Sequence, residues 1–198
     1  MSQPVPGPIS TVSDYLCIDF VNSRFTDHTG SGQVYDRLEL DGWRQWFADR
    51  CGLPARPALD ARAHRDLVSL RNLLRSLLEA GRHPGDETVA RLNGYLSRSG
   101  QTWELTREKR RLHMRLRWNG DGWPALMTAV VASYAMLLVS SDLGRVRVCA
   151  NPDCSFMFCD VTRNASRRWC DAAVCGNLMK VRQHRRLNDR DAAGQGSQ

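Results

Sequence analysis

Apolar residues recur at helical spacing through most of the first 140 positions of the chain. The clearest helix is predicted over 59–80, with Gly81 just beyond it as a stop signal; its apolar stripe is Leu67, Leu70, Leu74, Leu77 and Leu78. A second long helix is predicted from Pro124 to about Ser141. It is apolar on nearly every side, which is typical of the central helix of a core.

Two shorter helices and one hairpin complete this pattern. One helix is predicted over 42–50 with Asp41 as its cap, and the other from Asp86, as its cap, to about Arg98. Their expected buried faces are Trp43, Trp46 and Phe47 in the first, and Val89, Leu92, Tyr95 and Leu96 in the second. Alternating apolar and polar residues predict a hairpin with one face in water, with strands over 101–106 and 111–118 and a turn over 107–110.

The apolar run 15–22 can form either a short helix or a buried strand, because its periodicity fits both. It contains Asp19 and Asn22, and polar groups in such a run must find partners when they are buried. We expect these two residues to form a structural network or a ligand site. The two glycines in 26–33 predict a loop.

The last quarter of the chain contains two pairs of cysteines at the same short spacing. Cys149 and Cys154 form one C-x4-C pair, and Cys170 and Cys175 form the second pair fifteen residues later. Each pair brings two thiolates onto one turn, and two such turns can surround one Zn²⁺ tetrahedrally. The metal would supply folding free energy that so short a segment lacks. The sequence therefore predicts a structural zinc site.

A fifth cysteine leaves an alternative open. Cys159 also lies at C-x4-C spacing from Cys154, so these two residues could form the first pair. A short strand over 156–160 would instead make Cys159 a small apolar residue of the core. His184 lies nine residues beyond Cys175, which is too far for a short ligand spacing.

The formal net charge of +7 is concentrated beside these cysteines. Residues 145–190 carry ten Lys and Arg against four Asp and Glu, whereas residues 1–144 carry eighteen against sixteen. A local positive field of this kind is typical of a surface that meets phosphate, so DNA is the expected partner. The expected contacts are Arg163, Arg167 and Arg168 between the cysteine pairs, and Lys180, Arg182, Arg185 and Arg186 on a following basic helix.

These elements predict an α+β protein in two parts. A predominantly α-helical domain with a small β-hairpin is expected over 14–143. A small four-cysteine zinc finger with a C-terminal basic helix is expected over 145–187. Residues 1–13 and 190–198 are expected to be flexible tails.

Other classes of protein find less support in the sequence. The first ten residues lack the basic and apolar regions of a secretion signal. The longest apolar run, 125–139, is shorter than the roughly 20 residues that a bilayer needs, so no membrane association is expected. Reduced thiols predict a cytoplasmic protein. The sequence has no glycine-rich phosphate loop and no recognisable catalytic spacing, so we predict that the chain is not an enzyme.

The finger segment resembles the CGNR zinc finger, and the chain before it resembles the ABATE domain that usually precedes that finger. In the finger, the matching residues are Cys149, Cys154, Asp160, Arg163-Asn164-x-Ser166-Arg167-Arg168-Trp169-Cys170, Cys175-Gly176-Asn177 and Lys180. Before it, they are Leu16-Cys17-Ile18-Asp19-Phe20-Val21-Asn22, Trp43, Gly52-Leu53, Arg71 and Leu92-Asn93-x-x-Leu96. The resemblance covers about residues 14–187. It implies a bacterial stress-induced transcriptional regulator whose four cysteines bind zinc and whose partner is DNA.

One residue departs from the motif that names the finger: Leu178 stands where the family has arginine after Cys-Gly-Asn. If that arginine contacts DNA, this chain lacks one contact. Another function stays open at this stage, a zinc-thiolate redox switch or protein-interaction module without sequence-specific DNA binding. The N-terminal domain would act as a sensing or dimerising unit, so a homodimer and a small-molecule effector, with Asp19 in its site, are further hypotheses.

Overall fold

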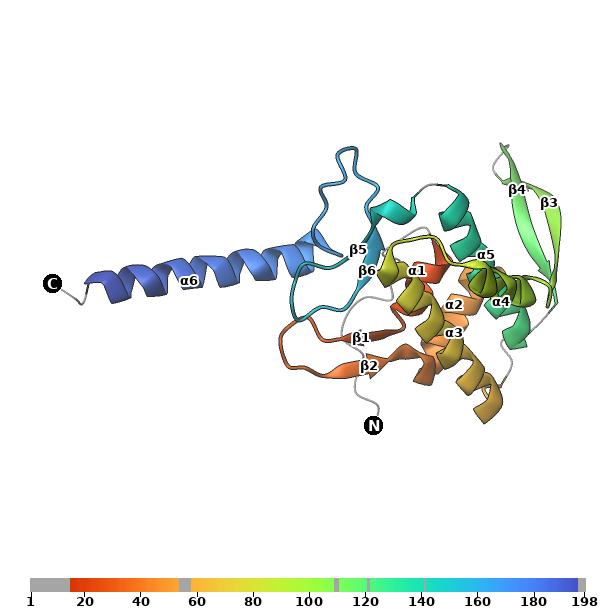
Figure 1. Ribbon diagram of the computed structural model, residues 1–198, viewed down its shortest axis with the longest axis horizontal. Helices are drawn as coiled ribbons and strands as arrows, with labels where there is room; N and C mark the ends of the chain where they lie inside the picture. The colour runs from red at the N-terminus through yellow and green to blue at the C-terminus, as the bar shows by residue number, and fades with distance from the viewer. Residues whose placement is uncertain (1–14, 54–57, 109–110, 121, 141, 196–198) are drawn as a thin grey trace.

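The structure is a computed structural model that describes residues 15–53, 58–108, 111–120, 122–140 and 142–195 (Figure 1). Its helices are α1 (Leu16–Val21), α2 (Asp41–Arg50), α3 (Ala61–Ala80), α4 (Asp86–Leu96), α5 (Gly122–Val139) and α6 (Asn177–Gln195). Its strands are β1 (Arg24–Thr26), β2 (Val34–Asp36), β3 (Gly100–Glu108), β4 (Arg111–Asn119), β5 (Val146–Val148) and β6 (Met157–Cys159). The predicted α+β class, mainly helical and with small hairpins, is confirmed.

The apolar run 15–22 forms helix α1, which lies at the centre of the core. Cys17, Ile18 and Phe20 are fully buried, and α1 packs against both α3 and α5. Helix α5 is the predicted core helix: ten of its residues are buried, among them Tyr134 and Leu137. Although α5 is long and apolar enough to cross a membrane, most of it lies inside the fold, as expected for the core helix of a soluble protein.

Helix α3 follows its predicted pattern. Four leucines of its stripe are buried, and Leu77 is partly buried against the same core. Asp60 caps its first turn by accepting a hydrogen bond from the Ala63 N–H, and Gly81 ends it in the left-handed conformation, with φ of 60°. Each buried leucine contributes roughly 1.5–3 kcal/mol to folding, so this stripe is a main attachment of α3 to the core.

The predicted caps of the two shorter helices were wrong. Asp41 and Asp86 are the first residues of α2 and α4, and the cap positions before them are Leu40 and Gly85. A carboxylate in the first turn still favours the helix, because it faces the positive end of the helix dipole. The predicted buried face of α4 was wrong at Val89, which is exposed, since only the turn that carries Leu92 and Tyr95 meets the core.

The predicted hairpin is present as β3 and β4, paired from Gly100 with Asn119 to Glu108 with Arg111. The predicted turn was wrong at residues 107 and 108, which continue β3, and residues 109–110 lie outside the described residues. The hairpin projects from the body, as Figure 1 shows, and Leu105 and Leu112 on its alternating apolar face are exposed. A second hairpin, β1–β2, encloses the predicted loop; its three-residue strands are too short to leave an alternating pattern.

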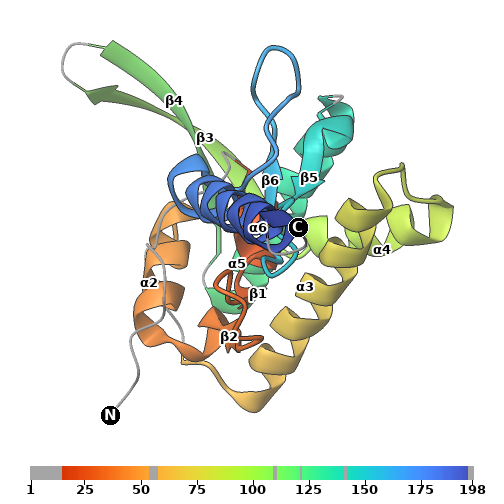
Figure 2. The ribbon, with the colours of Figure 1, turned by 90° about the vertical axis from the view of Figure 1, so that its left-hand side faces the viewer.

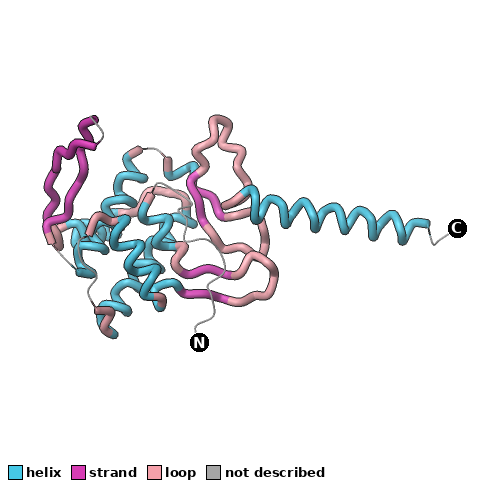
Figure 3. The backbone as a smooth tube through the Cα atoms, turned by 180° about the vertical axis from the view of Figure 1, so that it is seen from behind, coloured by secondary structure: helices cyan, strands magenta, loops and turns pink. Residues whose placement is uncertain are grey.

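The finger packs directly on the helical body. Strand β5 pairs with β6, and Met157 and Cys159 of β6 belong to the main core cluster together with α1 and α5. Figure 3 shows the finger loops between the helical body and α6. Helix α6 projects from the finger, and Figure 2 views it nearly end-on. It continues to Gln195, so the predicted flexible tail from residue 190 is helical as far as it is described.

Candidate metal centre

The sulfur atoms of Cys149, Cys154, Cys170 and Cys175 all lie within 4.8 Å of one another. The Sγ atoms of Cys154 and Cys170 are 3.7 Å apart, and those of Cys170 and Cys175 are also 3.7 Å apart. A tetrahedral site with metal–sulfur bonds of about 2.3 Å requires sulfur–sulfur distances of about 3.8 Å. The four buried thiols therefore fit a tetrahedral metal ion that binds soft sulfur ligands.

Backbone hydrogen bonds form the first half of this site. The Cys149 N–H donates to the Phe156 carbonyl at 2.8 Å, and the Cys154 N–H donates to the Asn151 carbonyl at 2.9 Å, which closes the turn between the first two cysteines. The buried Asn151 side chain donates to the Cys175 sulfur at 3.6 Å. Such outer contacts hold ligand sulfurs in place and stabilise their thiolate form.

A π-helical turn, Ala172–Gly176, positions the second pair. The Asp171 carboxylate accepts hydrogen bonds from the N–H groups of Ala173 and Val174 at 2.7 and 3.1 Å, and so fixes the start of the turn. A Cβ atom on Gly176 would lie 3.1 Å from the Trp169 ring. The glycine of the Cys-Gly-Asn motif therefore leaves room for the tryptophan that covers the site.

The thiols also change one another's acidity. Hydrogen bonds from Cys154, Cys170 and Cys175 hold the pKa of Cys149 below its usual range. The contact between Cys149 and Cys154 also raises the pKa of Cys154. A cluster that favours at least one thiolate is suited to metal binding, because metal ligands must be deprotonated.

The alternative first pair does not form. Cys159 is buried in the main core cluster beside Met157 and is not one of the four clustered thiols. It therefore has the apolar core role that the strand hypothesis gave it. His184 lies on exposed α6, with its Nε2 3.5 Å from the Asn188 side-chain nitrogen, and it is likewise outside the cluster.

The segment between the pairs, which we call the basic connector (residues 161–169), is held by buried Asp160. Its carboxylate accepts from the Thr162 hydroxyl at 2.6 Å and from the Arg167 N–H at 2.8 Å. The hydrogen bond from Thr162, with further bonds from the backbone, keeps the pKa of Asp160 below its usual range. Arg145 holds the beginning of the connector in place by donating to the Asp160 and Thr162 carbonyls at 3.1 and 2.9 Å.

Within the connector, Arg167 is used internally. Its Nε donates to the Trp169 carbonyl at 2.9 Å, and its Nη2 donates to the carbonyl of Cys170. Its guanidinium also lies 4.5 Å from the centre of the buried Phe158 ring. These contacts brace the metal ligand loop and leave Arg167 fewer donors for the nucleic-acid contact predicted for it. Arg163 is exposed, and exposed Arg168 lies over the Trp169 ring at 5.1 Å.

We expect Arg167→Ala to destabilise the folded protein by about 1–3 kcal/mol, because two hydrogen bonds and a cation–π contact are lost together. The matched Arg163→Ala substitution should change stability by less than about 0.5 kcal/mol, since that side chain is exposed. Urea unfolding of both variants measures the difference. Equal stability of the two variants would show that Arg167 does not brace the loop.

On α6, Arg182 is also held by the rest of the chain. It pairs with Asp153 of the first cysteine turn, and its Nη2 donates to the Thr29 carbonyl at 2.8 Å. This contact fixes the base of α6 against the β1–β2 loop. Lys180, Arg185 and Arg186 are exposed, and Leu178 is partly buried in the first turn.

The two polar residues of α1 are both engaged in the fold. Asp19 pairs with Arg50 of α2, with 2.9 Å between the Arg50 Nε and a carboxylate oxygen. The buried Asn22 side chain bonds both backbone groups of Met157, donating to the carbonyl and accepting from the N–H at 2.8 Å each. Between the two hypotheses for these residues, the contacts favour a structural network.

The sequence did not predict the structural roles of Asn151 and Arg71. Asn151 connects the metal site to the β1–β2 loop by donating to the His28 carbonyl at 2.9 Å, which a single asparagine in a turn does not reveal. Arg71 is buried and forms a two-point ion pair with Asp36, at 2.7 and 2.6 Å. Its place within the leucine stripe of α3 is a signal that could have predicted a buried ion pair.

These features define a helical domain that carries a four-cysteine metal-binding finger. Two family descriptions match the chain: "Putative stress-induced transcription regulator" (ABATE) over residues 14–141, and "CGNR zinc finger" over residues 145–187. The chain therefore belongs to the ABATE family and carries a CGNR zinc finger, as the resemblance in sequence predicted. A search of curated proteins found no match to the chain.

Proposed function

We propose that this protein is a cytoplasmic DNA-binding transcriptional regulator of a stress response, without enzymatic activity, whose finger holds one zinc ion. The observation that carries the proposal is helix α6. Residues 183–189 are exposed, and the helix projects from the body next to the metal centre (Figure 1). A polar helix with so few contacts is only marginally stable by itself, which favours a partner along its length.

Zinc is supported by the donor set. Four buried thiols at tetrahedral spacing, without a nitrogen or oxygen ligand among them, suit the structural type of zinc site. When bound, zinc would supply the cross-link that the small finger needs. It would thereby fix the connector and the base of α6, which is the part of the molecule that would meet DNA.

Of the seven basic residues predicted to contact DNA, the fold leaves five exposed. These five form the proposed DNA surface: Arg163, Arg168, Lys180, Arg185 and Arg186. Arg167 and Arg182 are excluded because their guanidinium groups are used inside the protein. With a rise of about 1.5 Å per residue, α6 is about 28 Å long, enough to lie along a groove of duplex DNA. The connector stands beside its first turn, where it can reach the phosphate backbone (Figure 3).

We expect binding to duplex DNA that falls steeply with salt, and weaker binding to every sequence after Arg185→Ala. Loss of one phosphate contact should reduce the slope of log K against log salt by about 0.9. The control is Arg82→Ala, which removes an exposed arginine just beyond α3 in the body. Fluorescence anisotropy with a random and a genomic duplex, between about 50 and 200 mM salt, measures both effects.

Absence of binding to either duplex at low salt would contradict the proposal. The finger would then be better explained as a protein-interaction module. An equal effect of Arg185→Ala and Arg82→Ala would show that attraction is due to overall charge and not to α6. A random pool selection with the wild-type protein would identify the preferred sequence, if the helix reads bases as well as phosphates.

A further inference from the structure

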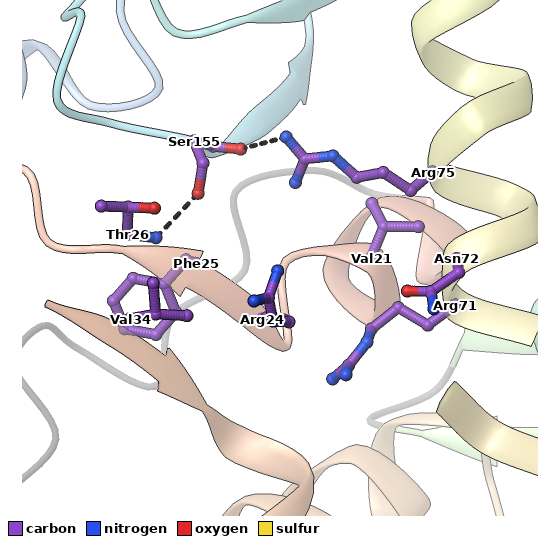
Figure 4. A pocket seen from close by; sticks show the side chains of 9 residues that line it. All are labelled: Val21, Arg24, Phe25, Thr26, Val34, Arg71, Asn72, Arg75 and Ser155. Atoms are coloured by element: carbon purple, nitrogen blue, oxygen red, sulfur yellow. Dashed lines mark hydrogen bonds between the residues drawn. The ribbon is translucent and has the colours of Figure 1, made fainter. Parts of the chain in front are cut away.

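A cavity of about 210 Å³ lies where the β1–β2 hairpin, α3 and the finger meet (Figure 4). Its polar lining includes three arginines: Arg24 from β1, and Arg71 and Arg75 from α3. Its apolar lining is formed by Val21, Phe25 and Val34. A cavity with a few convergent charged groups and an apolar wall is the usual form of a small-molecule site.

Arg71 is a buried part of this lining. Its side chain is 3% exposed, and its two terminal nitrogens bind the Asp36 carboxylate at 2.7 and 2.6 Å. Its Nε, however, is buried and has no acceptor among the described residues. The Nε has almost no exposed surface, so an occupant of the cavity cannot reach it while Arg71 holds this position.

The charges around the cavity do not cancel. Asp36 balances Arg71, and Glu79 balances Arg75 through a contact of 2.6 Å to its Nε. Arg24 is exposed and forms no ion pair with another described residue, so one positive charge remains. Arg75 also donates to the Ser155 carbonyl at 2.8 Å. A guanidinium has five N–H groups, so Arg75 still has some available for a ligand.

We propose that this cavity binds a small organic anion, with a carboxylate or phosphate group at the arginines and an apolar part against Phe25 and Val34. Arg24 and the unused N–H groups of Arg75 supply charge-assisted hydrogen bonds, which are the strongest that an oxyanion can receive from side chains. Its role rests on the proposed function: in a transcriptional regulator, an anion that bridges the helical body and the finger acts as an effector.

The link to the finger is Ser155, which directly follows the metal ligand Cys154. Its carbonyl accepts from Arg75, and its hydroxyl accepts from the Thr26 N–H at 2.8 Å, so both walls of the cavity are bonded to this one residue (Figure 4). An occupant that orders Arg75 therefore also orders the first cysteine turn. The coupling requires only a higher affinity of the anion for the docked finger than for the undocked one.

The test is isothermal titration calorimetry of the full chain at constant ionic strength with four probes: benzoate, phenyl phosphate, inorganic phosphate and the neutral benzamide. We expect saturable binding of benzoate or phenyl phosphate, with whichever binds more tightly identifying the oxyanion. Benzamide should not bind, and inorganic phosphate should bind more weakly than phenyl phosphate because it lacks an apolar part.

Arg24→Gln should weaken binding of the preferred probe about tenfold, as expected for loss of one charge-assisted hydrogen bond. Arg65→Gln removes an exposed charge on the same helix as Arg71 but away from the cavity lining, and should leave affinity unchanged. Because Arg24 is exposed, its replacement should leave the fold intact, which far-ultraviolet circular dichroism checks.

The proposal is overturned if none of the three anions binds saturably, or if Arg24→Gln and Arg65→Gln have the same effect. Binding of benzamide as tight as that of benzoate overturns it as well, since the arginines would then play no part. Arg185→Ala, the variant that tests DNA binding, should not change anion affinity. Failure of the DNA proposal and failure of this one are therefore distinguishable.

Discussion

Replacing Cys170 with alanine should remove bound metal and unfold the finger, whereas Cys159→Ala should leave one full equivalent of metal in place. Cys170 contacts two other cysteine sulfurs at 3.7 Å, and Cys159 lies outside the cluster. Both side chains are buried, so the two substitutions remove the same atoms from comparably covered sites. The difference between them isolates metal binding from packing.

The expected loss is large, because structural zinc sites contribute on the order of 10–16 kcal/mol of apparent binding free energy. Even a part of that exceeds the cost of about 1 kcal/mol for a small cavity at Cys159. Since each kcal/mol corresponds to about 2–4 °C for a chain of this size, Cys170→Ala should lower the melting temperature by more than about 10 °C.

Metal content of the purified variants, measured by inductively coupled plasma mass spectrometry, and thermal unfolding followed by circular dichroism check this result. A chelator added to the wild-type protein should reproduce the Cys170→Ala behaviour. If Cys159→Ala lost the metal and Cys170→Ala kept it, the four-cysteine assignment would be wrong.

The metal site was predictable because its signal is local. Two cysteine pairs with equal spacing are visible in the sequence, and the turn-forming residues between Cys149 and Cys154 fit the observed turn. The choice against Cys159 needed the fold, since Cys159 has the same spacing from Cys154. Only its burial in the main core, through the pairing of β6 with β5, excludes it.

The long helices were predictable for a similar reason. The leucine stripe of α3 and the long, almost uninterrupted apolar run of α5 define each helix without its neighbours. The exposed outer part of the β3–β4 hairpin shows the limit of that reasoning. Alternation places Leu105 and Leu112 on one face, but whether another element covers that face depends on tertiary packing.

The basic residues show a different limit. Composition predicted seven arginines and lysines as one DNA surface, but Arg167 and Arg182 bond carbonyls of the chain itself. An arginine that braces a loop and an arginine that meets phosphate have the same side chain and the same local sequence context. Only hydrogen-bond geometry separates them, and the cavity beside Arg24 and Arg71 was hidden for the same reason.

Asn22→Asp should destabilise the whole chain by about 2–5 kcal/mol, because it breaks a fully buried contact between the helical body and the finger. The Asn22 amide donates to the Met157 carbonyl and accepts from the Met157 N–H, both at 2.8 Å, and both residues are 1% exposed. Aspartate keeps the shape of asparagine but replaces its donor with an oxygen. That oxygen would face the Met157 carbonyl in a buried place.

Asn22→Ala should have a loss in the same range, since it leaves two buried backbone groups of Met157 without partners. The control is Asn93→Ala on the exposed side of α4, expected within about 0.5 kcal/mol of the wild type. Urea unfolding followed by tryptophan fluorescence provides the free energies. Equal stability of the Asn22 and Asn93 variants would show that this contact does not hold the two parts together.

The form of the unfolding curve tests the shared core as well. Met157 is buried with α1 and α5, so loss of the Asn22 contact should loosen the finger and the body together, in one transition. Two separated transitions in Asn22→Asp, the first accompanied by release of metal, would mean that the finger is an independent unit docked on the body. A common core requires a single unfolding transition whose midpoint is shifted to a lower urea concentration.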